Sequence, residues 1–277
     1  MKKVLLGLFT LTLVLVLAAC GGGGSKDDAS GDKGTTLVIG ASNSPHAVIL
    51  EKAKPILAKK GINLDIKKYT DYVMPNVALD EGDLDANYFQ TIPYMDLEMK
   101  EKGYKFVNMG GIHIEPMGLY SKKIDSLDAL PKNALVIMSN SKSDWPRVLG
   151  ILADGGVIKL KEGVKRQDVT FDDIVENPKN IKFKYDVDAG YLMTAYNNKE
   201  GDVVAINSNF VVDQGMNPKK DAIAIEKTDS PYVNIIAAQE KNKDNKDIKE
   251  LVKVLQSKEI QDFITKEWKG AVVPVSN

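Results

Sequence analysis

Arg147 is the residue of this sequence with the clearest capacity for binding chemistry. It falls in the first turn of a helix that Ser143 or Asp144 is predicted to begin, where a cation opposes the helix dipole at a cost of about 0.3–1 kcal/mol. The free N–H groups at a helix start attract anions, and a guanidinium can hold a carboxylate through two hydrogen bonds. We therefore predict that Arg147 binds a ligand carboxylate. The alternative is an ion pair with Asp144, three residues earlier on the same helix face.

Several asparagines stand in predicted strands or near their ends. They are Asn140, Asn207, Asn209 and Asn234. An amide group offers two donors and an acceptor, so it could bind either the amino group or the carboxylate of a zwitterion. Each of these asparagines could equally be a turn residue.

Four aromatic residues stand at predicted strand ends or in the first turns of helices. Tyr69 and Tyr72 surround one such junction, and Phe89 and Tyr94 surround the next. In open α/β sheets the strand ends face the ligand crevice, so together these side chains predict an apolar cage. Packing beneath loops is the alternative for each of them taken singly.

Cys20 is the only cysteine of the chain and directly follows the tripeptide Leu-Ala-Ala. Two lysines and an apolar run over residues 4–17 precede it, which is the pattern of a secretory signal peptide. The run is shorter than the roughly 20 apolar residues of a spanning helix. We expect residues 1–19 to be a signal peptide of the bacterial lipoprotein kind and the Cys20 thiol to carry diacylglycerol. Residues 20–36, rich in glycine, serine and mixed charge, are predicted to be a flexible tether.

The composition is that of a globular protein and argues against several functions. Hydrophobic residues make up 43% and charged residues 27% of the chain, which is typical of a protein with a substantial core. The net charge of −1 gives no electrostatic basis for binding nucleic acid. The sequence lacks the common hydrolase and phosphate-loop motifs, and its two histidines, His46 and His113, are far apart in sequence. We therefore expect no catalysis, no metal site and no cofactor.

Hydrophobic periodicity predicts two α/β units that would position the candidate side chains. In the first unit, strands at 37–41, 64–69 and 85–89 alternate with helices at 45–60, 71–79 and 92–102, which favours a parallel sheet. The second unit is expected to contain strands at 134–138, 181–185 and 203–206, helices at 144–153 and 189–197, and helical turns at 127–130 and 171–175. A strand at 233–238 and one helix over 244–263 follow. Two such units suggest two lobes with a ligand cleft between them.

Six segments, in order along the chain, resemble the NlpA-type methionine-binding lipoproteins, which are the solute receptors of methionine ABC importers. The resemblance runs from about Leu37 to the C-terminus. The segments are PHAVIL (45–50), TDYVMPN (70–76), GDLDANYFQ (82–90), YSKKI (120–124), VENPKN (175–180) and SPYVN (230–234).

This resemblance implies an α/β, two-lobed periplasmic-binding-protein fold of type II, with two crossover strands and the ligand cleft between the lobes. Lobe 1 would comprise residues 37–115 and 233–277, and lobe 2 residues 116–232. The protein would be a monomer held by its lipid on the extracytoplasmic side of the cell membrane. It would deliver L-methionine to an ABC permease driven by a cytoplasmic ATPase.

The resemblance also implies roles for the candidate residues. Arg147 would hold the α-carboxylate, Asn207 would contact the polar end of the amino acid, and Asn140 and Asn234 would assist. The thioether would be enclosed by aromatic rings, whose edges sulfur favours. The side chains expected around it are Tyr69, Tyr72, Phe89, Thr91 and Tyr94.

Three stretches depart from the family pattern. Thr91 and Ile92 stand where the family often has a histidine and a basic residue, Trp145-Pro146 stands where a glycine commonly precedes the arginine, and residues 188–191 also differ. Because Thr91 is small, the space beside it could admit an extra residue on the amino side of the ligand. The alternatives are therefore a receptor for a glycyl-methionine-like dipeptide or another apolar amino acid, and a surface adhesin or sensor on the same fold.

Overall fold

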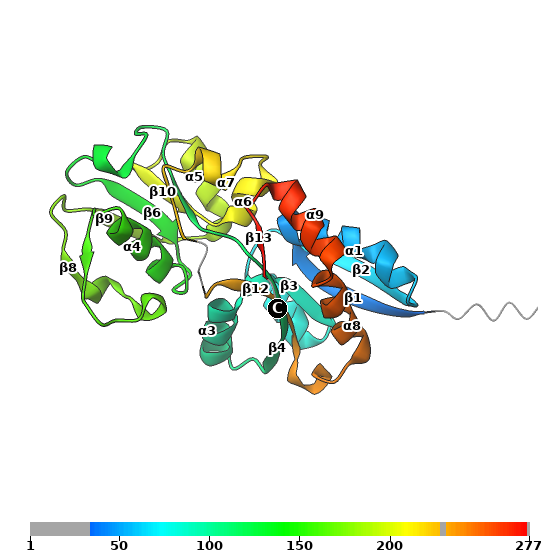
Figure 1. The fold of residues 1–277 in the computed structure, drawn as a ribbon. Helices are drawn as coiled ribbons and strands as arrows, with labels where there is room; N and C mark the ends of the chain where they lie inside the picture. Colours follow the sequence, from blue (N-terminus) through cyan, green and yellow to red (C-terminus); the bar gives the residue numbers. More distant parts are fainter. Residues whose placement is uncertain (1–33, 228–230, 276–277) are drawn as a thin grey trace, which may run out of the picture. The chain divides into compact units, whose positions relative to one another are not determined.

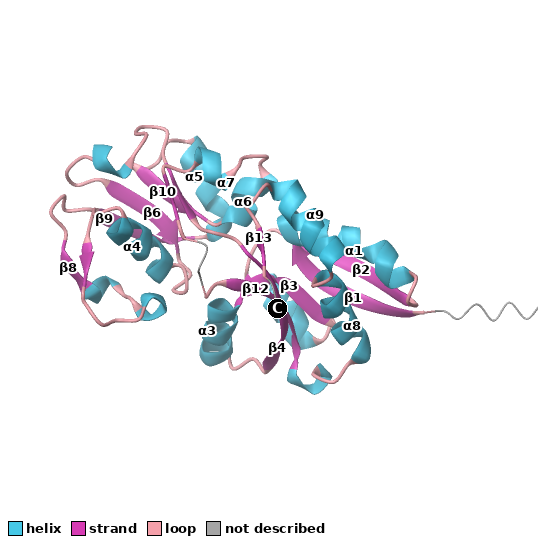
Figure 2. Cartoon of the chain, viewed as in Figure 1, coloured by secondary structure: helices cyan, strands magenta, loops and turns pink. Residues whose placement is uncertain are grey.

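Two β-sheets with helices on both faces organise the chain in the computed structural model, which describes residues 34–227 and 231–275 (Figures 1 and 2). The predicted signal peptide, Cys20 and most of the predicted tether lie outside the described residues. Thr35 and Thr36, predicted to belong to the tether, are already part of the first strand. Within the described ranges, every helix is too short or too polar to cross a bilayer.

The first sheet has six strands in the order β13-β4-β12-β3-β1-β2. They are β1 (Thr35–Ser42), β2 (Ile62–Tyr69), β3 (Ala86–Thr91), β4 (Phe106–Ile114), β12 (Val233–Gln239) and β13 (Val273–Pro274). β1 pairs in parallel with β2 and β3, but β12 runs antiparallel to both of its neighbours, β3 and β4. The parallel pairing predicted for the first three strands is therefore confirmed. The sheet as a whole is mixed, because a strand from late in the sequence inserts between β3 and β4.

Strand β4 was not predicted, because two glycines interrupt its apolar pattern. Gly110 and Gly111 lie opposite Ile236 and Ile235, between two shifts in the register of the β4–β12 pair. Glycine in a strand often marks a close approach of another segment. A Cβ atom on Gly110 would come within 2.5 Å of Val252, so this glycine allows a helix to pack closely on the strand.

Helices cover both faces of the six-stranded sheet. They are α1 (Val48–Ala58), α2 (Met74–Glu81), α3 (Ile92–Lys102), α8 (Lys246–Leu255) and α9 (Lys258–Trp268). α1, α8 and α9 share one core with Ile236 and Ala238, whereas α2 and α3 share the other with Ile235 and Ala237. The two cores follow from the alternation of side chains along β12, since successive residues of a strand point to opposite faces.

The C-terminal helical segment is two helices and not the single helix predicted over 244–263. α8 ends at Leu255, and α9 begins at Lys258 after Ser257, whose backbone is extended. The Gln261 side chain donates to the carbonyl of Leu255 at 2.7 Å, which satisfies one of the free carbonyl groups at the end of α8.

The second sheet has five strands in the order β11-β5-β10-β6-β9. They are β5 (Gly118–Tyr120), β6 (Leu135–Ser139), β9 (Lys182–Val187), β10 (Val203–Ile206) and β11 (Ala224–Ile225). β6, β9 and β10 are parallel, and β5 is antiparallel to β10 and β11. Its helices are α4 (Trp145–Asp154), α5 (Leu192–Asn197), α6 (Ser208–Asp213) and α7 (Pro218–Asp221).

Small elements complete the second half. The predicted helical turn at 171–175 is a 3-10 turn over Phe171–Asp173 followed directly by a strand, β8 (Ile174–Glu176), which pairs with β7 (Lys159–Leu160). The remaining short turns are Asn43–Ala47, Leu127–Ala129, Arg166–Asp168, Ala189–Tyr191 and Glu240–Asn242.

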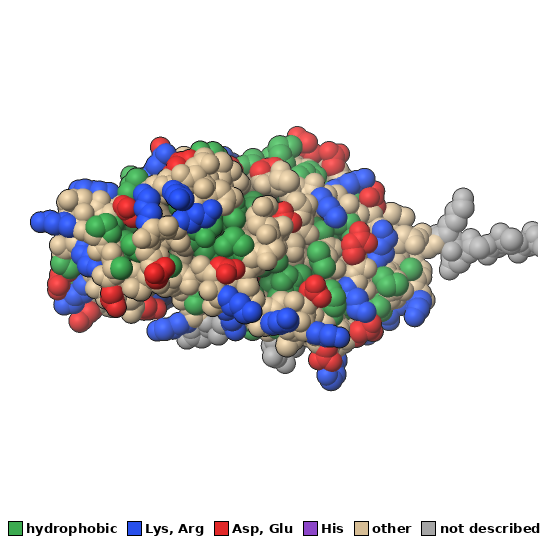
Figure 3. Space-filling model, turned by 90° about the horizontal axis from the view of Figure 1, so that it is seen from above, with side chains coloured by type: hydrophobic (Ala, Val, Ile, Leu, Met, Phe, Trp, Pro, Cys, Tyr) green, Lys and Arg blue, Asp and Glu red, His purple; other side chains and the backbone are tan. Residues whose placement is uncertain are grey.

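The chain passes between the two sheets twice. The first crossover lies between β4 and β5 and contains Glu115, and the second lies between β11 and β12 and contains Glu226. The surface carries lysines and arginines interspersed with acidic side chains over the face shown in Figure 3, in keeping with the net charge of −1.

Candidate ligand-binding site

One pocket brings together seven of the nine side chains that the sequence predicts for the ligand site. They are Tyr72, Phe89, Thr91, Tyr94, Arg147, Asn207 and Asn234. Arg147 and Asn207 follow strands of the second sheet and the other five belong to the first sheet and its loops, so the pocket lies between the two sheets. The other two predicted residues lie elsewhere: Asn140 is exposed, and Tyr69 lines an adjacent cavity.

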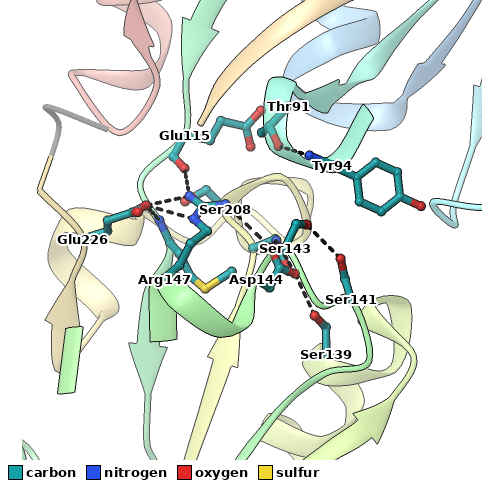
Figure 4. Close-up of polar contacts among 12 residues, drawn as sticks. Thr91, Tyr94, Glu115, Ser139, Ser141, Ser143, Asp144, Arg147, Ser208 and Glu226 are labelled. Carbon is teal, nitrogen blue, oxygen red and sulfur yellow. Dashed lines mark hydrogen bonds and ion pairs between the residues drawn. The ribbon is translucent and has the colours of Figure 1, made fainter. Parts of the chain in front are cut away.

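Arg147 is buried in the first turn of α4 and is held by acceptors from both crossovers (Figure 4). Its Nη2 donates to Glu226 Oε2 at 2.6 Å and to the Glu115 carbonyl at 2.7 Å, and its Nε donates to the same Glu226 oxygen at 3.1 Å. The guanidinium also lies 4.5 Å from the centre of the Tyr232 ring. Burial lowers the pKa of Arg147, but Glu226 and Asp144 more than offset this, so the pKa lies above its ordinary value. The side chain is therefore a permanent cation.

The partner of Arg147 that sequence reasoning missed is Glu226. Asp144, the alternative offered by the sequence, has its Oδ1 3.9 Å from Arg147 Nη1, which is beyond hydrogen-bond distance. Glu226 also accepts from the backbone N–H of Met117 at 3.2 Å. Arg147 and Glu226 thus connect the second crossover to the first.

Asp144 and Asn207 form a second buried contact beside the arginine. Asn207 Nδ2 donates to both carboxylate oxygens of Asp144, at 3.1 and 3.2 Å, and the Ser139 hydroxyl donates to Asp144 Oδ2 at 2.7 Å. Burial raises the pKa of Asp144, and the nearby Arg147 opposes this rise. We call Ser139, Asp144, Arg147, Asn207 and Glu226 the arginine cluster.

Three aromatic rings gather on one wall of the pocket. Tyr72, Phe89 and Tyr94 lie with their ring centres 6.0–6.1 Å apart in each pair. The Tyr72 hydroxyl donates to Asn209 Oδ1 at 2.6 Å, and the Tyr94 hydroxyl donates to the Tyr72 carbonyl at 2.9 Å. Thr91 is the N-cap of α3 and accepts from the Tyr94 backbone N–H. An apolar wall with satisfied hydroxyl groups suits a flexible apolar side chain of a ligand.

A second buried group, the histidine cluster, borders the pocket on the side of the six-stranded sheet. It consists of His46, Tyr88, His113, Glu115 and Asn234. His113 Nε2 lies 2.7 Å from Glu115 Oε1, and His113 Nδ1 accepts from the Tyr88 hydroxyl. His46 Nε2 lies 3.0 Å from Asn234 Oδ1 and 3.3 Å from Glu115 Oε1.

The histidines of this cluster are uncharged. Burial lowers the pKa of His46 to about 4 and that of His113 to about 3. At pH 7 both rings are therefore neutral, and their contacts with Glu115 are hydrogen bonds rather than ion pairs. Burial also raises the pKa of Glu115, although His46 and Arg147 oppose the rise.

The histidine cluster contains the one group in residues 34–227 and 231–275 with the side chains and spacing to hold a metal ion. His46, His113 and Glu115 each present one ligand atom, and these atoms lie within 4.8 Å of one another. Each of the three atoms already makes a hydrogen bond within the cluster, so we assign no metal to it.

Contacts at the exposed edge of the pocket join the two halves of the chain. Lys142, in the loop between β6 and α4, lies 2.6 Å from Glu101 of α3, and both side chains are exposed. In the interior, the Tyr72–Asn209 hydrogen bond joins the loop after β2 to α6.

Sequence reasoning missed several residues that line the pocket. They are His46, Gln90, Glu115, Ser141, Ser143, Asp144 and Ser208. Asn209, one of the asparagines named from the sequence, also lines it. His46 and Gln90 lie within segments quoted for the family resemblance, so their positions could have suggested them. Glu115 lies in none of these segments. It follows strand β4, which was not predicted because two glycines interrupt its apolar pattern.

Comparisons with known proteins agree with this architecture. The family model described as NlpA lipoprotein matches residues 37–276. The methionine-binding lipoprotein MetQ of Bacillus subtilis is 46% identical over 278 aligned residues, which cover all of both chains.

Two solved structures are similar over most of this chain. The pheromone cOB1 precursor/lipoprotein of the YaeC family from Enterococcus faecalis has 57% sequence identity and a TM-score of 0.86, covering 87% of this chain and 100% of that one. A nutrient-binding protein from Burkholderia cenocepacia, bound to methionine, has 41% identity and a TM-score of 0.80, covering 86% of this chain and 99% of that one. These likenesses confirm the two-lobed periplasmic-binding-protein fold predicted from the sequence.

Proposed function

The chain belongs to the NlpA lipoprotein family, and on this premise we propose that it binds L-methionine between its lobes and delivers it to an ABC permease with a cytoplasmic ATPase. Under this proposal the protein is a monomeric receptor and not an enzyme, and lipid on Cys20 holds it at the extracytoplasmic side of the cell membrane. Lobe 1 comprises residues 37–115 and 233–277, and lobe 2 residues 116–232.

The observation that carries the proposal is the pairing of a buried arginine with an aromatic wall in one pocket. Arg147 uses Nε and Nη2 for Glu226 and Glu115, while its Nη1 makes no hydrogen bond to any residue that the structure describes. Nη1 is thus the donor left for a ligand carboxylate, and charge-assisted hydrogen bonds of this kind are strong. Asn207 and Asn234 stand near it as further polar contacts.

The aromatic wall supports a thioether as the ligand side chain. Tyr72, Phe89 and Tyr94 provide it, whereas Tyr69, expected there from the sequence, lines the adjacent cavity. A sulfur atom near an aromatic ring gains about 0.3–1.5 kcal/mol per contact. A sulfoxide oxygen would have no donor on this wall, because the Tyr72 and Tyr94 hydroxyl groups already donate elsewhere.

Calorimetry with a ligand series tests this proposal. L-Methionine should bind, norleucine should bind more weakly, and methionine sulfoxide should bind about 5- to 150-fold more weakly than methionine, as expected for an unpaired polar group that costs about 1–3 kcal/mol. Equal affinity for the sulfoxide would remove the thioether argument. Metabolic labelling with palmitate, present in the native protein and absent from Cys20→Ala, tests the lipid anchor.

A methionine-containing dipeptide is the second candidate ligand, and one observation favours it. The adjacent cavity shares Tyr72 and Asn209 with the pocket and is lined further by polar side chains such as Ser42 and Asp213. Displacement of the Tyr72–Asn209 contact would join the two spaces and admit an added residue. Stabilisation by glycyl-methionine but not by methionine in a thermal-shift assay would identify the dipeptide as the ligand.

A further inference from the structure

The orientation of the Asn207 amide is fixed by its neighbour. Asn207 Nδ2 lies 3.1 and 3.2 Å from the two carboxylate oxygens of Asp144. An ionised carboxylate only accepts hydrogen bonds, so the amide atom that faces it must be the NH₂ group. The Asn207 carbonyl oxygen is consequently turned away from Asp144.

That carbonyl oxygen is a buried acceptor that lacks a donor. Asn207 Oδ1 is inaccessible to solvent and accepts no hydrogen bond from the part of the chain that the structure describes. Leaving a buried acceptor unpaired is costly, and such an atom in a pocket points to a ligand that donates to it. Asn207 lines the pocket together with Asp144 and Arg147.

Asp144 is itself held in place, and its ion pair with Arg147 is too long for a hydrogen bond between the two side chains. The Ser139 hydroxyl donates to it at 2.7 Å, its side chain makes no capping hydrogen bond to α4, and it is almost fully buried. Arg147 already pairs with Glu226 at 2.6 Å and lies 3.9 Å from Asp144. Asp144 therefore does not cap the helix, and its ion pair with Arg147 is longer than the one that Arg147 makes with Glu226.

We propose that Asp144 is the positioning residue for recognition of the ligand's ammonium group. It turns the Asn207 carbonyl oxygen toward the ligand as an acceptor, and it supplies the negative charge that balances the ammonium. The ligand class of this pocket is then a primary amine that also carries a carboxylate. This inference deepens the proposed function, on whose pocket it rests, by assigning the atoms that select for the amine.

The test compares methionine with 4-(methylthio)butanoate, which is methionine without its amino group. In calorimetry the native protein should prefer methionine by on the order of 10⁴-fold, since a site built to bind a polar group strongly rejects an analogue that lacks it. Asp144→Asn keeps the shape of the side chain but removes its charge and allows the Asn207 amide to turn. This variant should lower the preference by about 10- to 100-fold, mainly through weaker methionine binding.

Two further variants keep the test decisive. Asn207→Ala removes the acceptor itself and should lower the same preference ratio, and Asp186→Asn, an exposed acid of β9 outside the pocket, should leave the ratio unchanged. Circular dichroism and thermal melting would establish that each variant is folded. An unchanged ratio in both Asp144→Asn and Asn207→Ala would overturn the inference while leaving methionine binding intact.

The same experiment applies if the ligand is a dipeptide. If the native protein binds glycyl-methionine and not methionine, the matched pair becomes glycyl-methionine and N-acetylmethionine, which is that dipeptide without its amino group. A fall of the ratio in Asp144→Asn would then support the inference although methionine had failed as the ligand. Binding of neither pair would overturn both proposals.

Discussion

The two polar clusters that border the pocket hold their asparagines in opposite senses. In the histidine cluster, His46 faces the carbonyl oxygen of Asn234 at 3.0 Å, which leaves the Asn234 NH₂ group as the atom available to donate. In the arginine cluster, Asp144 faces the NH₂ group of Asn207, which leaves the carbonyl oxygen available to accept. The same residue type thus serves two chemistries, and its neighbours decide which.

The clusters also differ in the charge state of their buried side chains. The histidine cluster keeps its two rings neutral, because burial lowers the pKa of each, and for His46 this outweighs the opposing effect of Glu115. The arginine cluster keeps a charge that two acidic neighbours stabilise. The first group resembles a structural network, and the second is suited to an ionic ligand. Changes that affect each cluster separately will test this contrast.

The largest effect is expected for Arg147→Ala. Loss of one partner of a buried ion pair costs about 3–5 kcal/mol, because Glu226 would keep its charge without its guanidinium partner at 2.6 Å. Chemical denaturation should therefore show a large loss of stability in the absence of ligand, in addition to the loss of methionine binding. A residue with a role only in ligand binding would leave this stability unchanged.

Arg166→Ala is the matched control for that variant. Arg166 pairs with Asp154 at 2.9 Å, but both side chains are substantially exposed, and exposed pairs contribute about 0–1 kcal/mol. Comparable destabilisation by the two substitutions would contradict the assignment of Arg147 to a buried pair that holds the crossovers.

Lowering the pH is expected to have an intermediate effect on stability. The folded-state pKa values of His46 and His113, about 4 and about 3, lie below the ordinary value of about 6.5. Between these limits the unfolded chain binds protons that the folded chain does not, so stability falls as the pH falls below about 6.5. Each histidine should remove about 2 kcal/mol of unfolding free energy between pH 7 and pH 5. The raised pKa of Glu115 acts in the opposite direction and reduces the total.

Urea denaturation of the native chain and of His113→Gln at pH 7, 6 and 5 measures this slope. The variant should be less stable at pH 7 but should lose less stability on acidification, because one of its two buried rings is gone. Identical slopes in the two proteins would mean that His113 is not held neutral by burial.

The smallest effect is expected at the exposed edge of the pocket. Lys142→Ala removes the contact of 2.6 Å with Glu101 and should cost less than about 1 kcal/mol, an effect that added salt should diminish further. Thermal melts at low and high salt would measure it. If Lys142→Ala lost as much stability as Arg147→Ala, the exposed contact would be as strong as the buried ones, and the contrast between them would be wrong.

Local signals predicted some elements to the residue. The helix at 92–102 ends at Gly103, whose left-handed backbone (φ 80°) closes it, and β10 spans the predicted residues 203–206. In both cases the apolar pattern and the boundary residues lie within one short stretch of sequence. The mixed sheet was not predicted, because the pairing of β12 with β3 joins residues such as Asn234 and Thr91, whose partnership no local pattern records.

In the site, too, contacts between residues distant in sequence could not be predicted. Arg147 could be recognised from its place at a helix start, but Glu226 is 79 residues away along the chain and carries no local sign of the contact. His46 and His113 are distant in sequence, yet their ring centres are 5.0 Å apart. Of the two tyrosines predicted at this junction, only Tyr72 lines the pocket, because the strand β2 ends at Tyr69 and the loop that follows carries the chain into the pocket.

The position of β12 has a consequence for the order in which the chain can assemble. The second sheet draws all its strands from residues 118–225, one continuous stretch, whereas the six-stranded sheet receives β12 only after residue 232 has emerged. Pairings between residues distant in sequence form slowly, since the intervening chain must first be brought together. We therefore expect the second lobe to fold first. Until β12 is added to the first lobe, β3 and β4 would each have one unpaired edge. A chain that ended before residue 233 would leave two open strand edges, which are sites for aggregation.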